Sequence, residues 1–348
     1  MKTAFAIDLL LERTPEVRLL ELLLAGHEDA DVYCLAHSPG ALQGEIERHR
    51  IIASPLSRMV ASNADLAKKA WLLPSAARQL RVDAGVENLV VVSSGWAHVF
   101  PTAPGTKKHV WLYRFDDPRT TLRGWQRVFA PYHRQVKLAG LPTDATAFAS
   151  EALMKDVGRT GPVIAPAVDT EDFVFVPDES HPGDHPHHTV LLGGMTREGI
   201  ARLVDVFAAA RVPAKLLGDS QGVAPKGSVE LVEGIHCSAT TAAFTHGARA
   251  VWALGELPFP EGALGALCCG RPVVVSDTAV NHEFLGDGVG WYTSDWASTL
   301  AQVERDYLGV ERKSLRRQGL RWNGRLFKAR MRDFTGIGTV PAPSSLLT

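Results

Sequence analysis

The residues best suited to chemistry lie in segment 250–291, where small residues begin a predicted helix. An apolar run is followed by a turn rich in Pro, Glu and Gly, and the helix predicted over 262–269 then ends at Gly270, a typical helix stop. Gly262 and Ala263 would leave the first backbone N–H groups of this helix uncovered. Those donors, together with the helix dipole, can bind a phosphate group. Small residues here can equally serve close packing, so composition alone leaves both interpretations open.

Four short motifs follow one another from the middle of the chain onward. They are VIAP at 163–166 with VDTEDF at 168–173, FPEG at 259–262, CGRPVV at 269–274, and Glu283 followed by a Gly-rich loop. In this order they resemble the interdomain signature and the nucleotide-sugar-binding segment of the retaining GT-B glycosyltransferases of family 4. The resemblance implies the superfamily and its fold, and it says little about a particular donor or acceptor.

The resemblance also implies a donor-binding site. The helix that begins near Gly262 would bind the donor's phosphates through its first amides. A loop with two consecutive glycines is similar to the family's phosphate loop, and Arg197, just after it, is the cation available to the pyrophosphate. A Gly-Ile pair would lie beside the nucleotide base. The implied donor-binding residues are Gly193, Gly194, Gly234, Ile235, Glu256, Gly262, Ala263 and Leu264.

Departures from the family pattern affect the same site. Family members carry two glutamates eight positions apart, the first on the donor sugar and the second on the nucleotide ribose. When the Gly-Arg-Pro motif is aligned, the second falls at Gly265 and the first at Leu257. Glu256 or Glu261 would then take over the task of the missing carboxylate, or donor binding is degraded. Gly194 also stands where the family has an arginine.

The first part of the chain would bind the acceptor. The segment YRFDDPR at 113–119 resembles the Tyr-x-His-x-Pro-x-Arg motif of family mannosyltransferases, with Phe115 in place of the histidine. Tyr113 and Arg119 match the motif and are expected to bind the acceptor, although Arg119 could instead be a solvated surface residue. His98 is a candidate base or hydrogen-bond donor, with a structural histidine as the alternative. The implied catalytic residues are Arg197, Glu261 and His98.

Short apolar runs alternate with helical patterns along the chain, which is typical of parallel sheets covered by helices. The predicted strands are 3–10, 31–35, 89–93, 110–113, 146–150, 163–166, 189–193, 215–218, 229–232, 250–254 and 271–276. A helix is predicted over 16–24, with Pro15 suited to its first position. Two such α/β units predict two doubly wound domains, with a ligand outside the carboxyl ends of the strands. With the resemblance, the expected fold is GT-B: two Rossmann-like domains facing across a cleft and a C-terminal helix crossing back to the first.

The predicted organisation has five parts. They are an acceptor-side domain over 1–172, a linker over 173–188, a donor-binding domain over 189–314, a returning helix over 315–335, and a tail over 336–348. The linker contains His181, His185, His187 and His188, interpreted as a solvated run rather than a metal site. Segment 312–332 carries nine Lys or Arg and no Asp or Glu. It is interpreted as a helix with solvated charges, and the alternative is a surface for acidic lipid or a phosphorylated substrate.

Composition excludes several broad classes. The 348 residues carry 37 Lys+Arg against 38 Asp+Glu, a net charge of −1, which argues against a chain that binds nucleic acid as a whole. No apolar window of about 18 residues and no secretory pattern is found, and the four cysteines lack the spacing of a zinc site or a disulfide framework. Hydrolase, kinase and dehydrogenase fingerprints are absent as well. We expect a cytoplasmic protein, with peripheral contact to the inner face of the membrane if segment 312–332 binds lipid.

The resemblance to the GT-B glycosyltransferases of family 4 implies a retaining glycosyltransferase, and we expect a role in cell-envelope polysaccharide biosynthesis. It would move a hexose from a nucleotide-diphosphate sugar to a hydroxyl of a glycan or lipid-linked acceptor, with no cofactor and no essential metal. Asp29-Ala30-Asp31 spells the metal motif of an unrelated transferase class, but it precedes a predicted strand and is interpreted as a solvated turn. The alternative function is a catalytically degraded GT-B protein that binds a sugar or serves as the partner subunit of another transferase.

Overall fold

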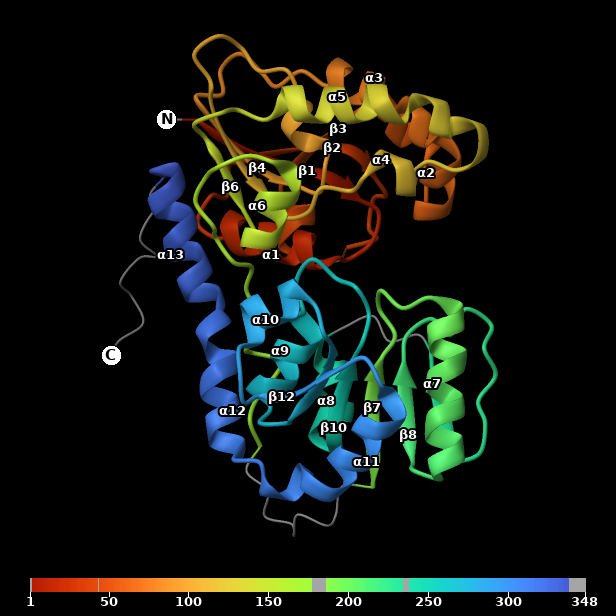
Figure 1. Ribbon diagram of the computed structural model, residues 1–348. Helices are drawn as coiled ribbons and strands as arrows, with labels where there is room; N and C mark the ends of the chain where they lie inside the picture. Colours follow the sequence, from red (N-terminus) through yellow and green to blue (C-terminus); the bar gives the residue numbers. More distant parts are fainter. Residues whose placement is uncertain (1, 43, 177–185, 234–237, 338–348) are drawn as a thin grey trace, which may run out of the picture. The chain divides into compact units, whose positions relative to one another are not determined.

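The structure is a computed structural model, and it describes residues 2–42, 44–176, 186–233 and 238–337 (Figure 1). The chain divides into two compact units. Unit 1 comprises Met1–Pro166 and the chain from Phe327 onward, and unit 2 comprises Ala167–Leu326. The first boundary therefore precedes the predicted one at residue 172. The return to unit 1 begins within the helix predicted over 315–335.

Unit 1 is built on a parallel sheet whose described strands have the order β3-β2-β1-β4-β5-β6. The strands are β1 Thr3–Leu10, β2 Asp31–His37, β3 Arg50–Ala53, β4 Asn88–Ser93, β5 Lys107–Leu112 and β6 Thr146–Phe148. The α-helices are α1 Pro15–Leu24, α2 Asn63–Lys69, α3 Leu73–Gln79, α4 Pro118–Thr121, α5 Ala130–Gly140 and α6 Glu151–Val157. The 3-10 helices are η1 Glu45–Arg48, η2 Pro55–Met59, η3 Ala70–Leu72, η4 Ala97–Val99 and η5 Gly124–Phe129. The strand order reverses between β1 and β4, which opens a crevice at their carboxyl ends.

Unit 2 repeats this topology with the order β12-β11-β10-β7-β8-β9, so that its reversal lies between β7 and β10. The strands are β7 His187–Leu191, β8 Ala214–Leu217, β9 Val229–Val232, β10 Ala248–Ala253, β11 Val273–Ser276 and β12 Gly290–Thr293. The α-helices are α7 Arg197–Ala210, α8 Ser238–His246, α9 Glu261–Cys268, α10 Ala279–Leu285, α11 Trp296–Asp306 and α12 Arg312–Gly319. The 3-10 helices are η7 Tyr307–Gly309 and η8 Leu320–Trp322, and α13, Gly324–Thr335, leads the chain from unit 2 back to unit 1.

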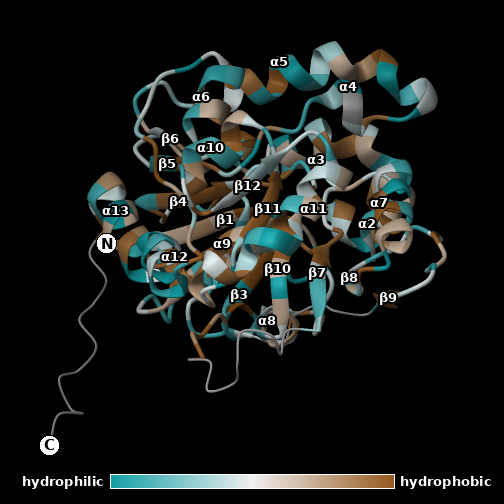
Figure 2. Cartoon of the chain, turned by 60° about the horizontal axis from the view of Figure 1, so that its bottom comes forward, coloured by the Kyte–Doolittle hydropathy of each residue, from teal (hydrophilic) through white to brown (hydrophobic). Residues whose placement is uncertain are grey.

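Each unit has its own hydrophobic core. The strands are largely hydrophobic, whereas the helices carry hydrophilic residues as well (Figure 2), as expected for parallel sheets covered on both faces. Trp252 of β10 lies at the centre of the unit 2 core, with its ring 5.3 Å from that of Phe207 on α7. Trp111 of β5 is fully buried in unit 1, and its indole N–H donates to the carbonyl oxygen of Ile164 (2.8 Å). No described helix is both long and apolar enough to cross a membrane.

Apolar patterning located the inner strands and overlooked two edge strands. The strands predicted over 3–10 and 229–232 have those bounds in the structure, and the other matches shift by a few residues. Strands β3 and β12 were not predicted, because each has only four residues, most of them partly exposed. The strand predicted over 163–166 is only an isolated bridge between Val163 and Phe148.

The C-terminal helical segment is interrupted, contrary to the prediction of one helix over 315–335. Helix α12 ends at Gly319, and η8 leads to Asn323, whose backbone is extended. The side chain of Asn323 accepts a hydrogen bond from the Leu326 amide (3.1 Å) and donates to the Leu320 carbonyl oxygen (2.8 Å). Asn323 therefore stabilises the start of α13 and ends the preceding turn.

His187 and His188 belong to β7 and are buried, which corrects their assignment to a solvated linker. Trp252 donates its indole N–H to His188 Nδ1 (3.1 Å), and His188 Nε2 donates to Glu304 Oε1 (2.9 Å). Burial lowers the pKa of His188, and it lowers the pKa of His187 to about 4. Both are therefore neutral residues of a core strand. His181 and His185 lie outside the described residues.

Candidate functional site

Two loops meet where the strand order of unit 2 reverses. One follows β7 and contains Gly193 and Gly194, and the other follows β10 and contains Gly255 and Glu256. A Cβ atom on Gly255 would lie 1.9 Å from the Gly193 carbonyl oxygen. Gly194 has a φ of +75°, and its Cβ would lie 3.0 Å from the Glu256 carbonyl oxygen. The loops therefore pack backbone against backbone, which only glycine permits.

An open hollow of about 690 Å³ lies beside these loops, at the carboxyl ends of β7 and β8. Its lining residues are Leu191, Leu192, Gly193, Gly194, Leu217, Gly218, Asp219, Gln221 and Thr241. A Cβ on Gly193 would meet no atom within 4 Å, so this glycine forms an open wall of backbone. The side-chain amide of Gln221 donates to the Met195 carbonyl oxygen (2.9 Å) and connects the loops after β7 and β8. Exposed backbone beside a hollow is suited to binding an anionic group.

The first turn of α9 packs against the same strand. Pro260 precedes the helix and provides no side-chain cap, and the Leu264 amide donates to the Pro260 carbonyl oxygen (3.0 Å). A Cβ on Gly262 would lie 2.3 Å from Cδ1 of Leu191, a residue that also lines the hollow. Gly262 thus lets α9 approach β7 closely, which supports the packing interpretation. The same approach brings the amide end of α9 next to the hollow, so the two interpretations are compatible.

The charged residues predicted for this site lie on the loops and helix ends around it. Arg197 is the exposed first residue of α7, after Thr196, whose side chain accepts from the Gly199 amide (3.1 Å). Glu256 is exposed on the loop after β10. Glu261 is the partly buried first residue of α9. Gly234 and Ile235, predicted to lie near the nucleotide base, are outside the described residues.

An aromatic ring fills the space beside Gly265, the position at which the sequence resemblance expects a glutamate. Gly265 is buried in α9, and a Cβ atom there would lie 2.7–2.8 Å from three ring carbons of Phe173. Phe173 is itself buried, because 4% of its surface is exposed. Any side chain at position 265 would therefore have to displace this ring. Glycine at position 265 is therefore required by the packing of the Phe173 ring in this chain.

His98, predicted to be catalytic, is fully buried in η4 of unit 1. Its Nε2 donates to the Lys137 carbonyl oxygen (2.9 Å), and its Nδ1 accepts from the Ser93 hydroxyl (2.8 Å). Burial lowers the pKa of His98 to about 3. A neutral imidazole with both nitrogens bonded inside the protein connects β4 to α5. This position argues against a catalytic role and favours the structural alternative.

The two residues predicted to bind the acceptor differ in exposure. Tyr113, at the end of β5, is 4% exposed, its amide donates to the Ser93 carbonyl oxygen (2.8 Å), and its ring lies 5.8 Å from that of Trp111. Arg119 is exposed on α4, with its amide bonded to the Asp117 side chain (2.9 Å). Arg119 is thus accessible to a ligand, whereas Tyr113 is mainly a packing residue.

Two buried ionisable side chains missed by the sequence analysis, Asp8 and Lys137, lie at the loop after β4 in unit 1. The Asp8 carboxylate, on β1, accepts hydrogen bonds from the amides of Ser94 (2.6 Å), Trp96 (3.0 Å) and Ala97. The Lys137 ammonium lies 5.0 Å from the Trp96 ring centroid. Burial raises the pKa of Asp8 to about 6 and lowers the pKa of Lys137 to about 8. The sequence could have indicated this site through Asp8, a carboxylate within the apolar run TAFAIDLL, because a buried carboxylate needs hydrogen-bond donors around it.

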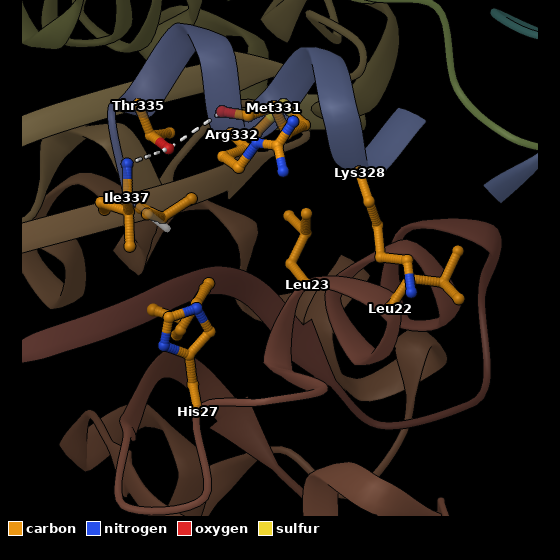
Figure 3. A pocket seen from close by; sticks show the side chains of 10 residues that line it. Leu22, Leu23, His27, Lys328, Met331, Arg332, Thr335 and Ile337 are labelled. Atoms are coloured by element: carbon orange, nitrogen blue, oxygen red, sulfur yellow. Dashed lines mark hydrogen bonds between the residues drawn. The ribbon is translucent and has the colours of Figure 1, made fainter. Parts of the chain in front are cut away.

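A separate hollow lies in unit 1 between α1 and α13 (Figure 3). Its lining is mainly apolar and includes Leu23 and Met331, with Lys328 and Arg332 at its margin. The hydroxyl of Thr335 donates to the Met331 carbonyl oxygen (2.9 Å) and closes the end of α13. None of the predicted site residues lines this hollow, which is the seam where α13 packs on the first helix.

Similarity to known proteins is found at the level of structure. No protein-family model and no curated protein matches the chain. The solved structure of sucrose-phosphate synthase from Thermosynechococcus elongatus matches with a TM-score of 0.69 and 16% identity, over 96% of this chain and 98% of that chain. HepE from Anabaena, solved in complex with UDP-glucose, matches with a TM-score of 0.64 and 12% identity, over 96% and 99% of the two chains. WaaG, a glycosyltransferase involved in lipopolysaccharide biosynthesis, gives 0.62 and 11%, over 96% and 100%.

The chain has the GT-B fold. The predicted α/β fold class is therefore confirmed, with one doubly wound sheet in each unit. In this GT-B chain the predicted residues that the structure brings together are Gly193, Gly194, Glu256 and Gly262, all around the β7–β10 reversal. The residues missed there are Gly255 and Phe173, whose importance arises from contacts between segments far apart in the sequence.

The buried histidines predict how the stability of this GT-B chain depends on pH. Burial lowers the pKa of His98 to about 3 and the pKa of His133 and of His187 to about 4. Below pH ~6.5 the unfolded chain binds protons that the folded chain excludes, so the free energy of unfolding falls by about 2 kcal/mol per histidine by pH ~5. The raised pKa of Asp8, about 6, acts in the opposite direction and offsets part of this loss. Urea unfolding at a series of pH values measures the dependence.

A pair of variants tests the origin of this effect. His133→Phe removes a buried imidazole and should make the fall between pH ~6.5 and ~4 less steep. His282→Gln removes an imidazole whose side chain is 48% exposed and controls for the loss of a histidine that is not buried. An unchanged slope in His133→Phe would contradict the assignment of the acid sensitivity to buried neutral histidines.

Proposed function

We propose that the chain is a glycosyltransferase that moves a hexose from a nucleotide-diphosphate sugar to a hydroxyl acceptor with retention of configuration. The observation that carries this proposal is the backbone surface of Gly193 and Gly194, packed on the Gly255–Glu256 backbone beside the first turn of α9. Such a surface presents amides to an anionic ligand at the point where a doubly wound sheet reverses. The GT-B fold is shared with HepE, which was solved with UDP-glucose, and this supports a nucleotide sugar as the donor.

The proposed chemistry assigns the diphosphate to the loop after β7 and to α9. During transfer the anomeric carbon becomes oxocarbenium-like while the leaving diphosphate gains negative charge. The first amides of α9 and the guanidinium of Arg197 would stabilise that charge without a metal ion. Glu256 and Glu261 are the carboxylates available to the sugar and the ribose. The departing phosphate would accept the proton of the acceptor hydroxyl on the same face, so no protein nucleophile is needed.

The acceptor would be bound by unit 1. Arg119 is an exposed cation of segment 113–119 that forms no ion pair with the described residues, unlike Arg114, whose guanidinium lies beside Glu16 and Asp116, and it suits a phosphorylated or acidic acceptor such as a lipid-linked sugar. Tyr113 would support the segment from the core, through its amide bond to Ser93 and its ring contact with Trp111. His98 is given no part in the reaction, because both of its ring nitrogens are bonded inside unit 1.

Nucleotide binding tests the proposal directly. Calorimetry with UDP, GDP, ADP and dTDP, each with and without magnesium, should reveal micromolar binding of one nucleotide that does not depend on the metal. Sugar panels on that nucleotide would then identify the donor. Folded protein that binds none of the four would refute the proposal and favour the degraded GT-B protein, for which the Phe173 ring at position 265 already provides a reason.

Substitution of Arg197 tests the phosphate assignment. Arg197→Ala should weaken nucleotide binding about tenfold, because one charge-assisted contact to the pyrophosphate is lost. Its melting temperature should not change, since the side chain is exposed. The matched control is Arg202→Ala, on the same helix and also exposed, with its guanidinium over the Trp296 ring. Equal affinities of the two variants would remove Arg197 from the site.

A further inference from the structure

Six large hydrophobic side chains are exposed together on unit 1, on and next to η2, η3, η5 and α5. They are Met59, Trp71, Trp125, Val128, Phe129 and Tyr132, here called the aromatic patch. Trp125 is 66% exposed and Val128 is 74% exposed. Within the described part of unit 1, every large hydrophobic side chain that is exposed belongs to this set. Such clustering on one face marks a surface that is covered by a partner.

Direct ring contacts connect parts of the patch that are far apart in the sequence. The ring of Trp125 lies 6.0 Å from that of Trp71 and 6.0 Å from that of Phe129. Arg78 on α3 donates to the Tyr132 hydroxyl on α5 (2.9 Å). Helices α3 and α5, which carry Arg78 and Tyr132, lie together on one side of unit 1 (Figure 1). Trp71, Trp125 and Phe129 therefore form one connected group of rings, with Val128 and Tyr132 close to it along the chain.

The chain around the patch is positively charged. Segment 66–82 carries four Lys or Arg, and segment 118–143 carries five, and neither contains Asp or Glu. Arg78, Arg123 and Arg127 are exposed, whereas Lys137 is buried. Asp65 and Asp117, which precede these two segments, have the Lys68 ammonium 3.8 Å and the Arg134 guanidinium 4.0 Å away, respectively. This excess of positive charge is local, since the whole chain has a net charge of −1.

We propose that the aromatic patch binds the surface of a membrane that contains anionic lipids. Trp and Tyr partition to the headgroup level of a bilayer, and Lys and Arg around them are attracted by acidic headgroups. Aliphatic side chains such as Met59 and Val128 gain by entering the acyl boundary and would gain nothing from a nucleic-acid backbone. A second copy of the chain is disfavoured as the occupant, because two patches surrounded by the same charge would repel each other.

The basic segment 312–332 is a poorer membrane surface. Of its larger apolar side chains, Leu315, Phe327 and Met331 are buried and Leu326 is 38% exposed. Arg312 and Arg316 both stack on the Phe175 ring, 5.1 Å from its centroid. Three of the larger apolar side chains of this segment thus pack inward, only Leu326 is exposed among its large hydrophobic residues, and part of its charge is used inside unit 2. Lipid contact is for these reasons assigned to the aromatic patch.

Vesicle binding by the full chain tests the proposal. We expect it to sediment with vesicles of phosphatidylcholine that contain about a third phosphatidylglycerol, and hardly at all with phosphatidylcholine alone. Binding should raise and blue-shift the tryptophan emission, and high salt should weaken it. The double variant Trp125→Ser/Val128→Ser should bind at least tenfold more weakly while keeping its circular dichroism and melting temperature, because both side chains are exposed.

The control for loss of an exposed apolar side chain is Leu308→Ser in unit 2, a residue that is 56% exposed and outside the patch. This variant should bind vesicles like the unmodified chain. Vesicle binding that survives in Trp125→Ser/Val128→Ser would overturn the proposal. So would a concentration-dependent dimer that this double variant abolishes and that does not bind vesicles, since the occupant would then be a second copy.

Discussion

Replacing Gly255 with alanine is expected to abolish nucleotide binding and to lower the free energy of unfolding of unit 2 by about 3 kcal/mol. The new Cβ would lie 1.9 Å from the Gly193 carbonyl oxygen and 2.9 Å from the carbonyl carbons of Gly193 and Gly194. All three atoms belong to the backbone, so no side-chain rotation can relieve the contact. The loop after β7 must move, and the proposed diphosphate site moves with it. Urea unfolding and calorimetry with the bound nucleotide measure the two effects.

The neighbouring glycines provide graded controls for this result. Gly193→Ala adds a methyl group that meets no atom within 4 Å, so its stability should match that of the unmodified chain. Gly194→Ala should be intermediate, because a φ of +75° is unfavourable for alanine and its Cβ would lie 3.0 Å from the Glu256 carbonyl oxygen. A Gly255→Ala protein with normal stability and normal affinity would show that the two loops are not packed as described.

The parts of the fold that could be predicted are those with a strong local signal. Strand β1 is an apolar run of eight residues, and α1 begins at Pro15 after a Thr14 side chain that accepts from the Val17 amide, so their limits could be predicted from the sequence. Edge strands such as β12 are short and partly exposed, so their hydropathy differs little from that of the loops beside them. The break at Asn323 could not be predicted from periodicity, because basic and apolar residues continue at helical spacing on both sides of it.

The candidate site was predictable where a motif lies within one segment. The glycines at 193–194 and 262 were identified in this way, and the structure places both at the reversal of the sheet. Roles that depend on distant contacts could not be predicted. The carbonyl group that binds His98 belongs to Lys137, on another helix, and the ring that fills position 265 belongs to Phe173. Sequence spacing carries no information about such pairs.

Restoring the family's glutamate, Gly265→Glu, is expected to reduce stability and not to improve donor binding. The side chain would have to enter the space of the Phe173 ring, 2.7–2.8 Å from its own Cβ, and its carboxylate would be buried without a prepared partner. Overpacking and desolvation together should lower the free energy of unfolding by about 4 kcal/mol. Nucleotide affinity should be unchanged or lower. Urea unfolding and calorimetry, as for Gly255→Ala, measure both quantities.

Three further variants identify the cause. Gly309→Glu places the same side chain in unit 2 where a Cβ meets no atom within 4 Å, and it should be tolerated. Phe173→Ala alone should cost about 3–5 kcal/mol through the cavity it leaves. The double variant Gly265→Glu/Phe173→Ala should be more stable than the sum of its single effects predicts, by about 2 kcal/mol, because the glutamate can occupy that cavity.

The nucleotide affinity of this double variant is informative as well. If it binds nucleotide more tightly than Phe173→Ala does, a glutamate at position 265 can reach the ribose, and the Phe173 ring is what prevents this in the unmodified chain. A Gly265→Glu single variant with normal stability and tighter nucleotide binding would contradict this prediction. It would show that the Phe173 ring moves aside freely and that packing does not require glycine at position 265.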